Sequence, residues 1–298
     1  MQTAVFGLGS MGLGMAQSLH RAGVDTHGFD PDAARQAGFA EESGNGLPLA
    51  EVAPNLDAAV IVVVNAAQTE DVLFGADSIV ALLRPGAVVM SCATVPPEFA
   101  RDMERRCADL SIHYLDAPIS GGAARAAKGD LSVMASGTQA AKDAAKPVLD
   151  AVATTVFDLG DSAGAGSAIK AVNQLLAGVH IATMAEALTF GLSQGVDAKT
   201  FLNVISQCAG TSWMLENRAP HIVAGDYTPH SAVTIWPKDL GIVTDIAANA
   251  GLQTPIAQAA LAQFQAAVDM GLGAEDDAAV AKLYARAAGL SLPGEDTA

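Results

Sequence analysis

The stretch that decides the fold is TAVFGLGSMG, which occupies residues 3–12. Its first residues favour a strand and a helical pattern starts at Met11, so the three glycines fall in a strand-to-helix turn. The spacing Gly7-x-Gly9-x-x-Gly12 is typical of loops that bind the pyrophosphate of a dinucleotide. Gly7 permits the tight turn, Gly9 lets the backbone approach the phosphates, and Gly12 lets helix and strand pack closely. The alternative is a glycine-rich turn that only connects the two elements.

The strand after this loop ends on an acid that bears on the choice of dinucleotide. Asp30 follows the glycine loop by about 20 residues, the interval at which a carboxylate binds the adenosine ribose hydroxyls. It would repel the 2′-phosphate of NADP, so we expect NAD, with NADP as the alternative because Arg35 lies close in sequence. Asp30 could instead cap a turn before Pro31. The residues expected to hold NAD here are Gly7, Leu8, Gly9, Ser10, Met11, Gly12 and Asp30.

Outward from the loop, short apolar runs of strand length alternate with helical stretches. Further runs of this kind occupy residues 24–30, 58–64, 87–94, 112–120, 131–137 and 154–160. Their alternation predicts a doubly wound α/β sheet of the Rossmann type. From Ala163 onward no run is typical of a strand, and residues 168–194 predict one long helix. We therefore expect an NAD-binding domain over residues 1–162 and an all-helical substrate and oligomerisation domain over 163–298, joined by the long helix.

Charge and composition exclude several classes of protein. The 298 residues include 16 Lys+Arg and 32 Asp+Glu, a formal net charge of −16, which disfavours nucleic-acid binding and polybasic attachment to membranes. The longest purely apolar run, residues 58–64, is far shorter than the ~20 residues of a membrane-spanning helix. Three irregularly spaced cysteines and an N-terminus without a basic segment favour a reduced, cytoplasmic protein.

Three segments beyond the glycine loop carry polar groups suited to a substrate. Residues 116–122, Asp-Ala-Pro-Ile-Ser-Gly-Gly, end a strand in a small-residue turn whose hydroxyl and N–H groups suit a carboxylate, unless it is an ordinary loop. Lys170 begins a helix among apolar neighbours, where a desolvated amine suits proton transfer, although such lysines usually extend to solvent. Asn173 and Gln174 follow on the same helical face. Lys238 is either a second positive charge near the cofactor or a solvated residue in a helix's first turn.

In order and spacing, the glycine loop, residues 116–122, the Lys170 segment and Lys238-Asp239-Leu240 resemble the β-hydroxyacid dehydrogenases, over nearly the whole chain. The resemblance implies NAD-dependent oxidation of a small hydroxy acid, with Lys170 as catalytic general acid/base. It further implies substrate-binding roles for Ser120, Gly121, Gly122, Asn173 and Gln174, and cofactor-binding roles for Asn65, Thr94 and Lys238. Several relatives carry asparagine four residues after the lysine, where this chain has Gln174, so which amide contacts the substrate is open.

The resemblance also narrows the substrate. Residues 173–182 and 211–214 are similar to those of family members that oxidise L-threonate, which implies L-threonate as substrate and 2-dehydro-L-erythronate as product. The alternatives within the family are 3-hydroxyisobutyrate oxidation and tartronate semialdehyde reduction. A non-catalytic NAD sensor or scaffold is the alternative of another class, although a sensor has no need of Lys170, Ser120 and Asn173.

Two further expectations concern metals and assembly. His180, His221 and His230 form no metal-ligand spacing, so we expect no metal. The alanine- and leucine-rich helices of the second half, such as residues 257–267, predict a homodimer or homotetramer, although a helical core explains the same composition.

Overall fold

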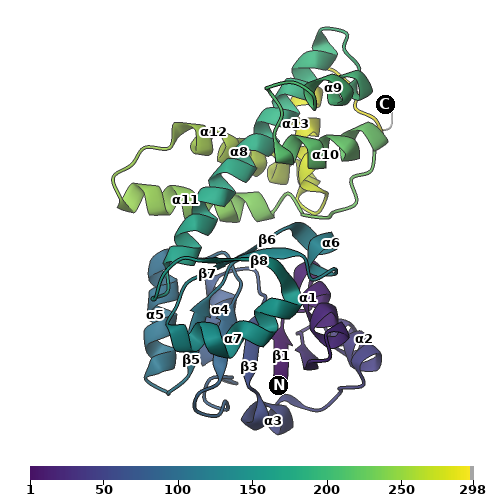
Figure 1. The fold of residues 1–298 in the computed structure, drawn as a ribbon. Coiled ribbons are helices and arrows are strands. Elements are labelled where there is room, and N and C mark those ends of the chain that lie inside the picture. The colour runs from purple at the N-terminus through teal and green to yellow at the C-terminus, as the bar shows by residue number, and fades with distance from the viewer. Residues whose placement is uncertain (296–298) are drawn as a thin grey trace. The chain divides into compact units, whose positions relative to one another are not determined.

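The computed structural model describes residues 1–295, and the chain divides into two compact units (Figure 1). Unit 1 is Met1–Lys170 and unit 2 is Ala171–Ala298. The strands of unit 1 are β1 (Gln2–Phe6), β2 (Asp25–Phe29), β3 (Ala58–Ile61), β4 (Val88–Ser91), β5 (His113–Asp116), β6 (Ile119–Ser120), β7 (Leu131–Ala135) and β8 (Ala153–Asp158). Its helices are α1 (Ser10–Arg21), α2 (Ala33–Ser43), α3 (Leu49–Val52), α4 (Ala66–Phe74), α5 (Pro97–Ala108), α6 (Gly122–Ala126) and α7 (Gln139–Val152).

Five of these strands form a parallel sheet in the order β2-β1-β3-β4-β5. Every residue of β3 and β4 is buried, as expected for a parallel sheet with both faces covered. The strand order reverses at β1, where Thr3 is paired with Thr26 of β2 on one side and Ala58 of β3 on the other. In doubly wound sheets ligands bind at the carboxyl ends of the strands around this point. The predicted α/β architecture is confirmed.

The prediction of a single strand over residues 112–120 is wrong. The segment divides into β5, in the parallel sheet, and β6, which pairs antiparallel with β7 in a second sheet of order β6-β7-β8. The chain changes sheets at Ala117 and Pro118. Ala117 still donates its N–H to Ser91 of β4, but Pro118 has no N–H and contributes only its carbonyl, which accepts from Met134 of β7. Residues 116–122 therefore connect the two sheets.

Unit 2 is helical, and no named strand lies in its described part, residues 171–295. The long helix α8 (Ala165–Ser193) begins in unit 1 and continues into unit 2, as the sequence predicted for residues 168–194. The contact boundary between the units thus falls inside α8, at Lys170. The further helices are α9 (Ala198–Ile205), α10 (Trp213–Ala224), α11 (Ile235–Asn249), α12 (Pro255–Ala267) and α13 (Val280–Ala287).

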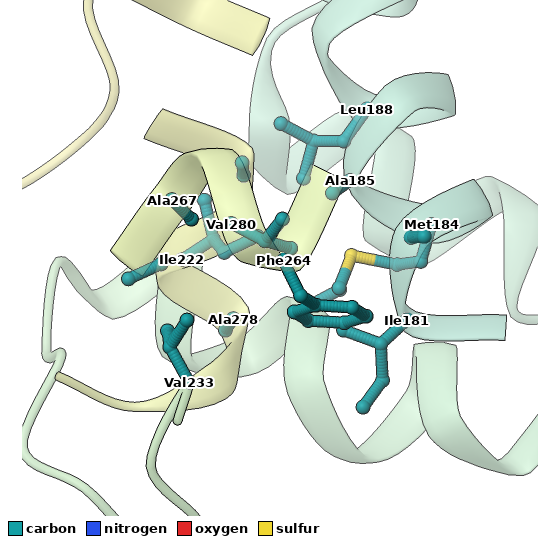
Figure 2. Packing of buried hydrophobic residues seen from close by; sticks show 14 of the residues in the cluster. Ile181, Met184, Ala185, Leu188, Ile222, Val233, Phe264, Ala267, Ala278 and Val280 are labelled. Atoms are coloured by element: carbon teal, nitrogen blue, oxygen red, sulfur yellow. The ribbon is translucent and has the colours of Figure 1, made fainter. Parts of the chain in front are cut away.

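The core of unit 2 is built around α8. Figure 2 shows Phe264 of α12 beside Ile181 and Met184 of α8, and all three side chains are buried. Trp236 of α11 stacks on Phe264 with ring centroids 5.6 Å apart. Where α8 meets α11, a Cβ added at Gly178 would lie 2.9 Å from the Trp236 ring, so only glycine allows this approach. This close packing fixes α11 against α8.

Helix α8 is also the one helix in residues 1–295 that is long and apolar enough to cross a membrane by length and composition. Its residues Ile181, Ala185 and Leu188 are fully buried in the core of unit 2. Other apolar residues of α8, such as Val172 and Phe190, are exposed.

Candidate functional site

The glycine loop lies between β1 and α1, and its glycines differ in what surrounds them. Gly7 has φ of 94°, and a Cβ there would lie 2.5 Å from the carbonyl oxygen of Val62. A Cβ on Gly12 would lie 1.8 Å from the carbonyl oxygen of Gly7. Around Gly9, in contrast, no atom lies within 4 Å of an added Cβ. The fold itself requires Gly7 and Gly12, whereas the open face at Gly9 fits a pyrophosphate beside the first turn of α1.

Asp30 ties the end of β2 to this loop. Its Oδ2 accepts from the N–H of Leu8 at 2.7 Å, and its Oδ1 accepts from the N–H of Asp32 at 2.8 Å. The Arg35 guanidinium lies 4.0 Å from the Asp30 carboxylate and 3.4 Å from that of Asp32. Arg35 is thus shared between two carboxylates, which weakens it as a partner for the 2′-phosphate of NADP.

The other predicted cofactor residues of unit 1 also follow strand ends. Asn65 comes after β3 and caps α4, accepting from the Gln68 N–H at 2.9 Å, while the Gln68 side chain accepts from Val64 N–H at 2.9 Å. Thr94 is half-buried and follows β4. The parallel sheet therefore places the glycine loop, Asp30, Asn65 and Thr94 at one edge, the carboxyl edge of the strands.

The turn after β6 has a backbone that suits an anion. Ser120 ends β6 and is half-buried, and the next two residues have positive φ, 139° at Gly121 and 78° at Gly122. Residues with side chains rarely adopt these angles, so the two glycines are required for the turn. The turn exposes small groups, one hydroxyl and backbone N–H groups, where a carboxylate can approach.

Lys170 is buried beside this turn. Its side chain has only 9 % of its surface exposed, and Nζ donates to the carbonyl oxygen of Ile119 at 2.9 Å. Ile119 directly precedes Ser120, so Lys170 Nζ lies next to the turn. Of the two alternatives for this lysine, a desolvated amine and a side chain extended to solvent, the structure contradicts the second. A buried amine next to hydroxyl and N–H groups is equipped for proton transfer.

The helix that carries Lys170 begins on a buried carboxylate. Asp116 at the end of β5 is 1 % exposed. Its Oδ2 accepts from the N–H groups of Gly164 and Ser167, each at 2.9 Å, and its Oδ1 accepts from the Ser167 hydroxyl at 2.7 Å. Ser136 adds a hydroxyl donor at 3.1 Å. Burial raises the pKa of Asp116, and these hydrogen bonds oppose the rise.

We predict that wild-type stability falls relative to the Asp116→Asn variant as the pH rises from about 4 to about 7. An unfolded aspartate has a pKa of about 3.9, and burial raises the pKa of Asp116 in the folded chain. The folded chain therefore holds this proton more tightly, so the contribution to stability is complete below pH ~3.9 and is lost as the pH rises through the folded pKa. Urea denaturation of both proteins at the two pH values measures the difference, and a constant or rising wild-type advantage contradicts the prediction.

In unit 2, a chain of polar contacts fixes the two amides of α8. Asn173 donates through Nδ2 to Gln174 Oε1 at 2.9 Å, and Gln174 donates through Nε2 to Asp239 of α11. Asp239 is 2 % exposed and forms an ion pair with Lys238 at 2.6 Å. Gln174 is buried, whereas Asn173 is half-buried. The buried amide is thus held by the protein on both sides, which leaves Asn173 as the better placed of the two to meet a substrate.

Two acids of the site, Asp116 and Asp239, have no role that the sequence alone predicts. Asp116 lies in the segment 116–122 and Asp239 follows Lys238, and both acids are almost fully buried. For Asp116 the available signal was its place at the end of a strand-forming run, because a buried carboxylate requires partners. Those partners are 51 and 65 residues away in the chain, at Ser167 and Gln174, so the sequence alone did not reveal them.

Within residues 1–295, no group of three or more His, Cys, Asp or Glu side chains is arranged to hold a metal ion. His221 and His230 lie close together in unit 2, with ring centroids 5.1 Å apart, and His221 Nδ1 contacts Asp276 at 2.9 Å. Asp276 is fully buried and caps a short helix at residues 277–279, so its role is structural.

The fold and this site together define a dinucleotide-binding oxidoreductase. Residues 2–160 match the NAD-binding domain of 6-phosphogluconate dehydrogenase, and residues 164–284 match the NAD-binding domain family of NADP-dependent 3-hydroxyisobutyrate dehydrogenase. The chain belongs to the β-hydroxyacid dehydrogenase family and is a hydroxyacid dehydrogenase that binds NAD(P).

Individual relatives match over almost their full length. The chain is 49 % identical to L-threonate dehydrogenase of Cupriavidus necator, covering 98 % of this chain and 97 % of the relative. It is 44 % identical to L-threonate dehydrogenase of Escherichia coli, covering 97 % and 96 %. A crystal structure of 3-hydroxyisobutyrate dehydrogenase from Salmonella typhimurium superimposes with a TM-score of 0.88 at 44 % identity, covering 95 % of this chain and 99 % of that one.

Proposed function

We propose that this enzyme oxidises the C2 hydroxyl of L-threonate to the 2-oxo acid, 2-dehydro-L-erythronate, with NAD as cofactor. The observation that carries the proposal is the buried Lys170 amine, 2.9 Å from the Ile119 carbonyl and beside the Ser120–Gly122 turn. Support for L-threonate comes from the relatives that share 44 to 49 % identity over nearly the whole chain.

Each residue of the site has a role in this proposal. Ser120, Gly121 and Gly122 hold the substrate carboxylate with hydroxyl and N–H donors. Lys170 takes up the proton of the C2 hydroxyl at Nζ and stabilises the alkoxide as it forms. When bound, the nicotinamide supplies the acceptor for the hydride that leaves C2. The proton and the hydride together account for the two hydrogens lost in the oxidation.

The remaining predicted residues bind cofactor or orient substrate. The glycine loop and Asp30 hold the dinucleotide, and Thr94 and Asn65 bind its nicotinamide half, as the common edge of the sheet favours. Lys238 binds the cofactor as well. In this proposal, residues 1–162 bind most of the dinucleotide, and residues 163–298 supply Lys170, Asn173 and Lys238.

Asn173, rather than Gln174, orients the substrate hydroxyl. We expect Asn173→Ala to lower kcat/KM for L-threonate by about 10- to 100-fold and to leave NADH binding unchanged, because the amide that it removes contacts the substrate hydroxyl and the Gln174 side chain but not the cofactor. Gln174→Ala is the matched control. It lowers the melting temperature instead, because it takes a donor away from the buried Asp239 carboxylate. Full activity in Asn173→Ala, together with lost activity in a folded Gln174→Ala, would reverse the two roles.

The choice of cofactor follows from Asp30. We expect kcat/KM to be about 100-fold higher with NAD than with NADP, since a 2′-phosphate would lie against the Asp30 carboxylate. Asp30→Asn narrows this ratio by about tenfold, the factor that 1.4 kcal/mol gives. Asp25→Asn at the other end of β2 serves as control and leaves the ratio unchanged. Wild-type protein that prefers NADP contradicts the assignment.

A substrate panel tests the proposed function. Purified protein is assayed with NAD⁺ and L-threonate, D-threonate, L-erythronate, D-erythronate and 3-hydroxyisobutyrate, and with NADH and tartronate semialdehyde. We expect the highest kcat/KM with L-threonate. Strong turnover of 3-hydroxyisobutyrate or tartronate semialdehyde without turnover of L-threonate would establish one of those reactions instead. NADH binding without any turnover would favour a non-catalytic sensor.

We further propose that the enzyme is a cytoplasmic homodimer or homotetramer. Its α8 exposes large apolar side chains, with 57 % of Val172 and 67 % of Phe190 exposed, which favours a protein partner over water. The three free cysteines suit a reducing compartment. Light scattering coupled to size-exclusion chromatography measures the assembly, and a monomer at micromolar concentration contradicts it.

A further inference from the structure

The first turn of α8 has its backbone donors satisfied from outside the helix. The first N–H groups of any helix lack partners within it. Here Asp116 accepts from the N–H groups of Gly164 and Ser167, and the Ser136 hydroxyl oxygen accepts from the N–H of Gly166 at 2.9 Å. Asp116 and Ser136 come from the strand region of unit 1, so α8 begins directly on the two sheets and not on a flexible connection.

Steric contacts allow little adjustment of this turn. A Cβ on Gly166 would lie 2.3 Å from the Met134 carbonyl oxygen of β7, and a Cβ on Gly164, where φ is 107°, would lie 3.0 Å from the Pro97 carbonyl oxygen. Glu104 of α5 adds a second carboxylate, which accepts from the Ala163 N–H with both oxygens at 3.1 Å. The helix start is therefore held by close packing and by two acids.

Residues 116–119 contact the first turns of α8 at a second point, three residues further along each segment. Asp116 contacts Ser167, and three residues later in each segment the Ile119 carbonyl accepts from Lys170 Nζ. Residues 116–119 thus hold α8 at two points, and only the second involves the reacting amine. If the first contact is lost, the helix can shift on the sheet and carry Lys170 with it.

We infer that Asp116 is a positioning residue for the reaction, which acts through Ser167 to set the place of the Lys170 amine beside the Ser120–Gly122 turn. The inference rests on the proposed function, because it assumes that Lys170 transfers the proton. It gives Asp116 a role distinct from binding: the side chain is 1 % exposed and its oxygens are occupied by four donors from the protein, so it contacts neither substrate nor cofactor.

Two variants test the inference against a matched control. Asp116→Asn keeps the shape but presents an amide to the helix N–H groups, and Ser167→Ala removes only the 2.7 Å hydroxyl contact. Ser18→Ala is the control, since Ser18 is equally buried in unit 1 and its hydroxyl donates to the Ala126 carbonyl at 2.9 Å, away from α8. For each we measure kcat, both KM values, the NADH dissociation constant, the melting temperature and the pH profile of kcat.

We expect kcat to fall about 100-fold in Asp116→Asn, since a displacement near 1 Å of a reacting group lowers the rate by about this factor. In Ser167→Ala, which removes one contact only, we expect kcat to fall about tenfold. KM for the hydroxy acid and the NADH dissociation constant stay within about threefold of wild type, because binding groups are untouched. The kcat pH profile moves along the pH axis in both variants, because the surroundings of the amine change. Ser18→Ala leaves kcat and its pH profile unchanged, whatever its effect on melting.

Wild-type kcat and pH profile in folded Asp116→Asn and Ser167→Ala overturn the inference, as does an equal loss in Ser18→Ala. If Asp116→Asn does not fold, Ser167→Ala decides alone, because it keeps the carboxylate and its other donors. These experiments distinguish failure of the proposed function from failure of the positioning role of Asp116. A wild type that turns over no hydroxy acid refutes the proposed function and the inference with it. Turnover lost in Lys170→Ala but kept in both variants refutes only the positioning role.

Discussion

Replacing Lys170 with alanine lowers kcat for L-threonate about 1000-fold, while the NADH dissociation constant stays within about threefold of wild type. Proton transfer by a positioned side chain contributes about 10²- to 10⁴-fold, and the lysine also stabilises the alkoxide. The amine lies against the Ile119 carbonyl at the turn assigned to the substrate, whereas the glycine loop and Asp30 hold the dinucleotide. Binding of NADH, followed by its fluorescence, should therefore survive a change that abolishes turnover.

A second substitution separates charge from proton transfer. Lys170→Arg keeps the positive charge, but a guanidinium does not give up its proton in proteins, so kcat stays low if the amine acts as acid and base. Lys146→Ala is the control, because Lys146 is an exposed lysine of unit 1 that forms an ion pair with Asp150 on its own helix. Normal turnover by Lys170→Ala would refute the mechanism. Restored turnover in Lys170→Arg would assign the lysine a purely electrostatic role.

Replacing Gly9 with alanine raises the dissociation constant for NADH about 100-fold and leaves the melting temperature unchanged. A Cβ at this position meets no protein atom within 4 Å, so the fold has room for it. The space it would fill is the one assigned to the pyrophosphate, and a methyl group there keeps the phosphates from the N–H groups of the loop. The effect on binding is therefore separated from any effect on folding.

Substitutions at two other glycines serve as controls for Gly9→Ala. Gly38 in α2 is exposed and also has no atom within 4 Å of an added Cβ, so Gly38→Ala should raise stability by up to about 1 kcal/mol and leave NADH binding unchanged. Gly12→Ala should lower the melting temperature, because its Cβ would overlap the Gly7 carbonyl. Unchanged NADH affinity in Gly9→Ala would place the dinucleotide elsewhere than on this loop.

The features that the sequence predicted are those carried by local pattern. The glycine spacing at residues 7–12, the acid at the end of the next strand and the alternation of apolar runs were sufficient to predict the doubly wound sheet. The long helix over residues 168–194 was predicted to within three residues of α8 at its start and one at its end. These features depend on neighbours in the chain, which periodicity and glycine spacing report directly.

What the sequence could not predict depends on contacts between distant residues. The burial of Lys170 was left open because a lysine among apolar helix neighbours can extend in either direction, and only the approach of Ile119, 51 residues away, decides it. The same holds for Gln174, whose burial follows from Asp239 on α11. The strand over residues 112–120 was predicted as continuous because its apolar pattern does not reveal that Pro118 ends pairing in one sheet.

The continuity of α8 limits which changes in chain length the site tolerates. Lys170 and Asn173 stand on one unbroken helix, so about 4.5 Å along its axis and most of a full rotation separate them. Inserting or deleting one residue between them would turn everything downstream by about 100°, moving the amide off the lysine's face. A substitution in this segment keeps the two side chains on one face, whereas an insertion or deletion does not. Length changes are tolerable in the link between α8 and α9, at residues 194–197, because no two site residues there have to stay on one helix face.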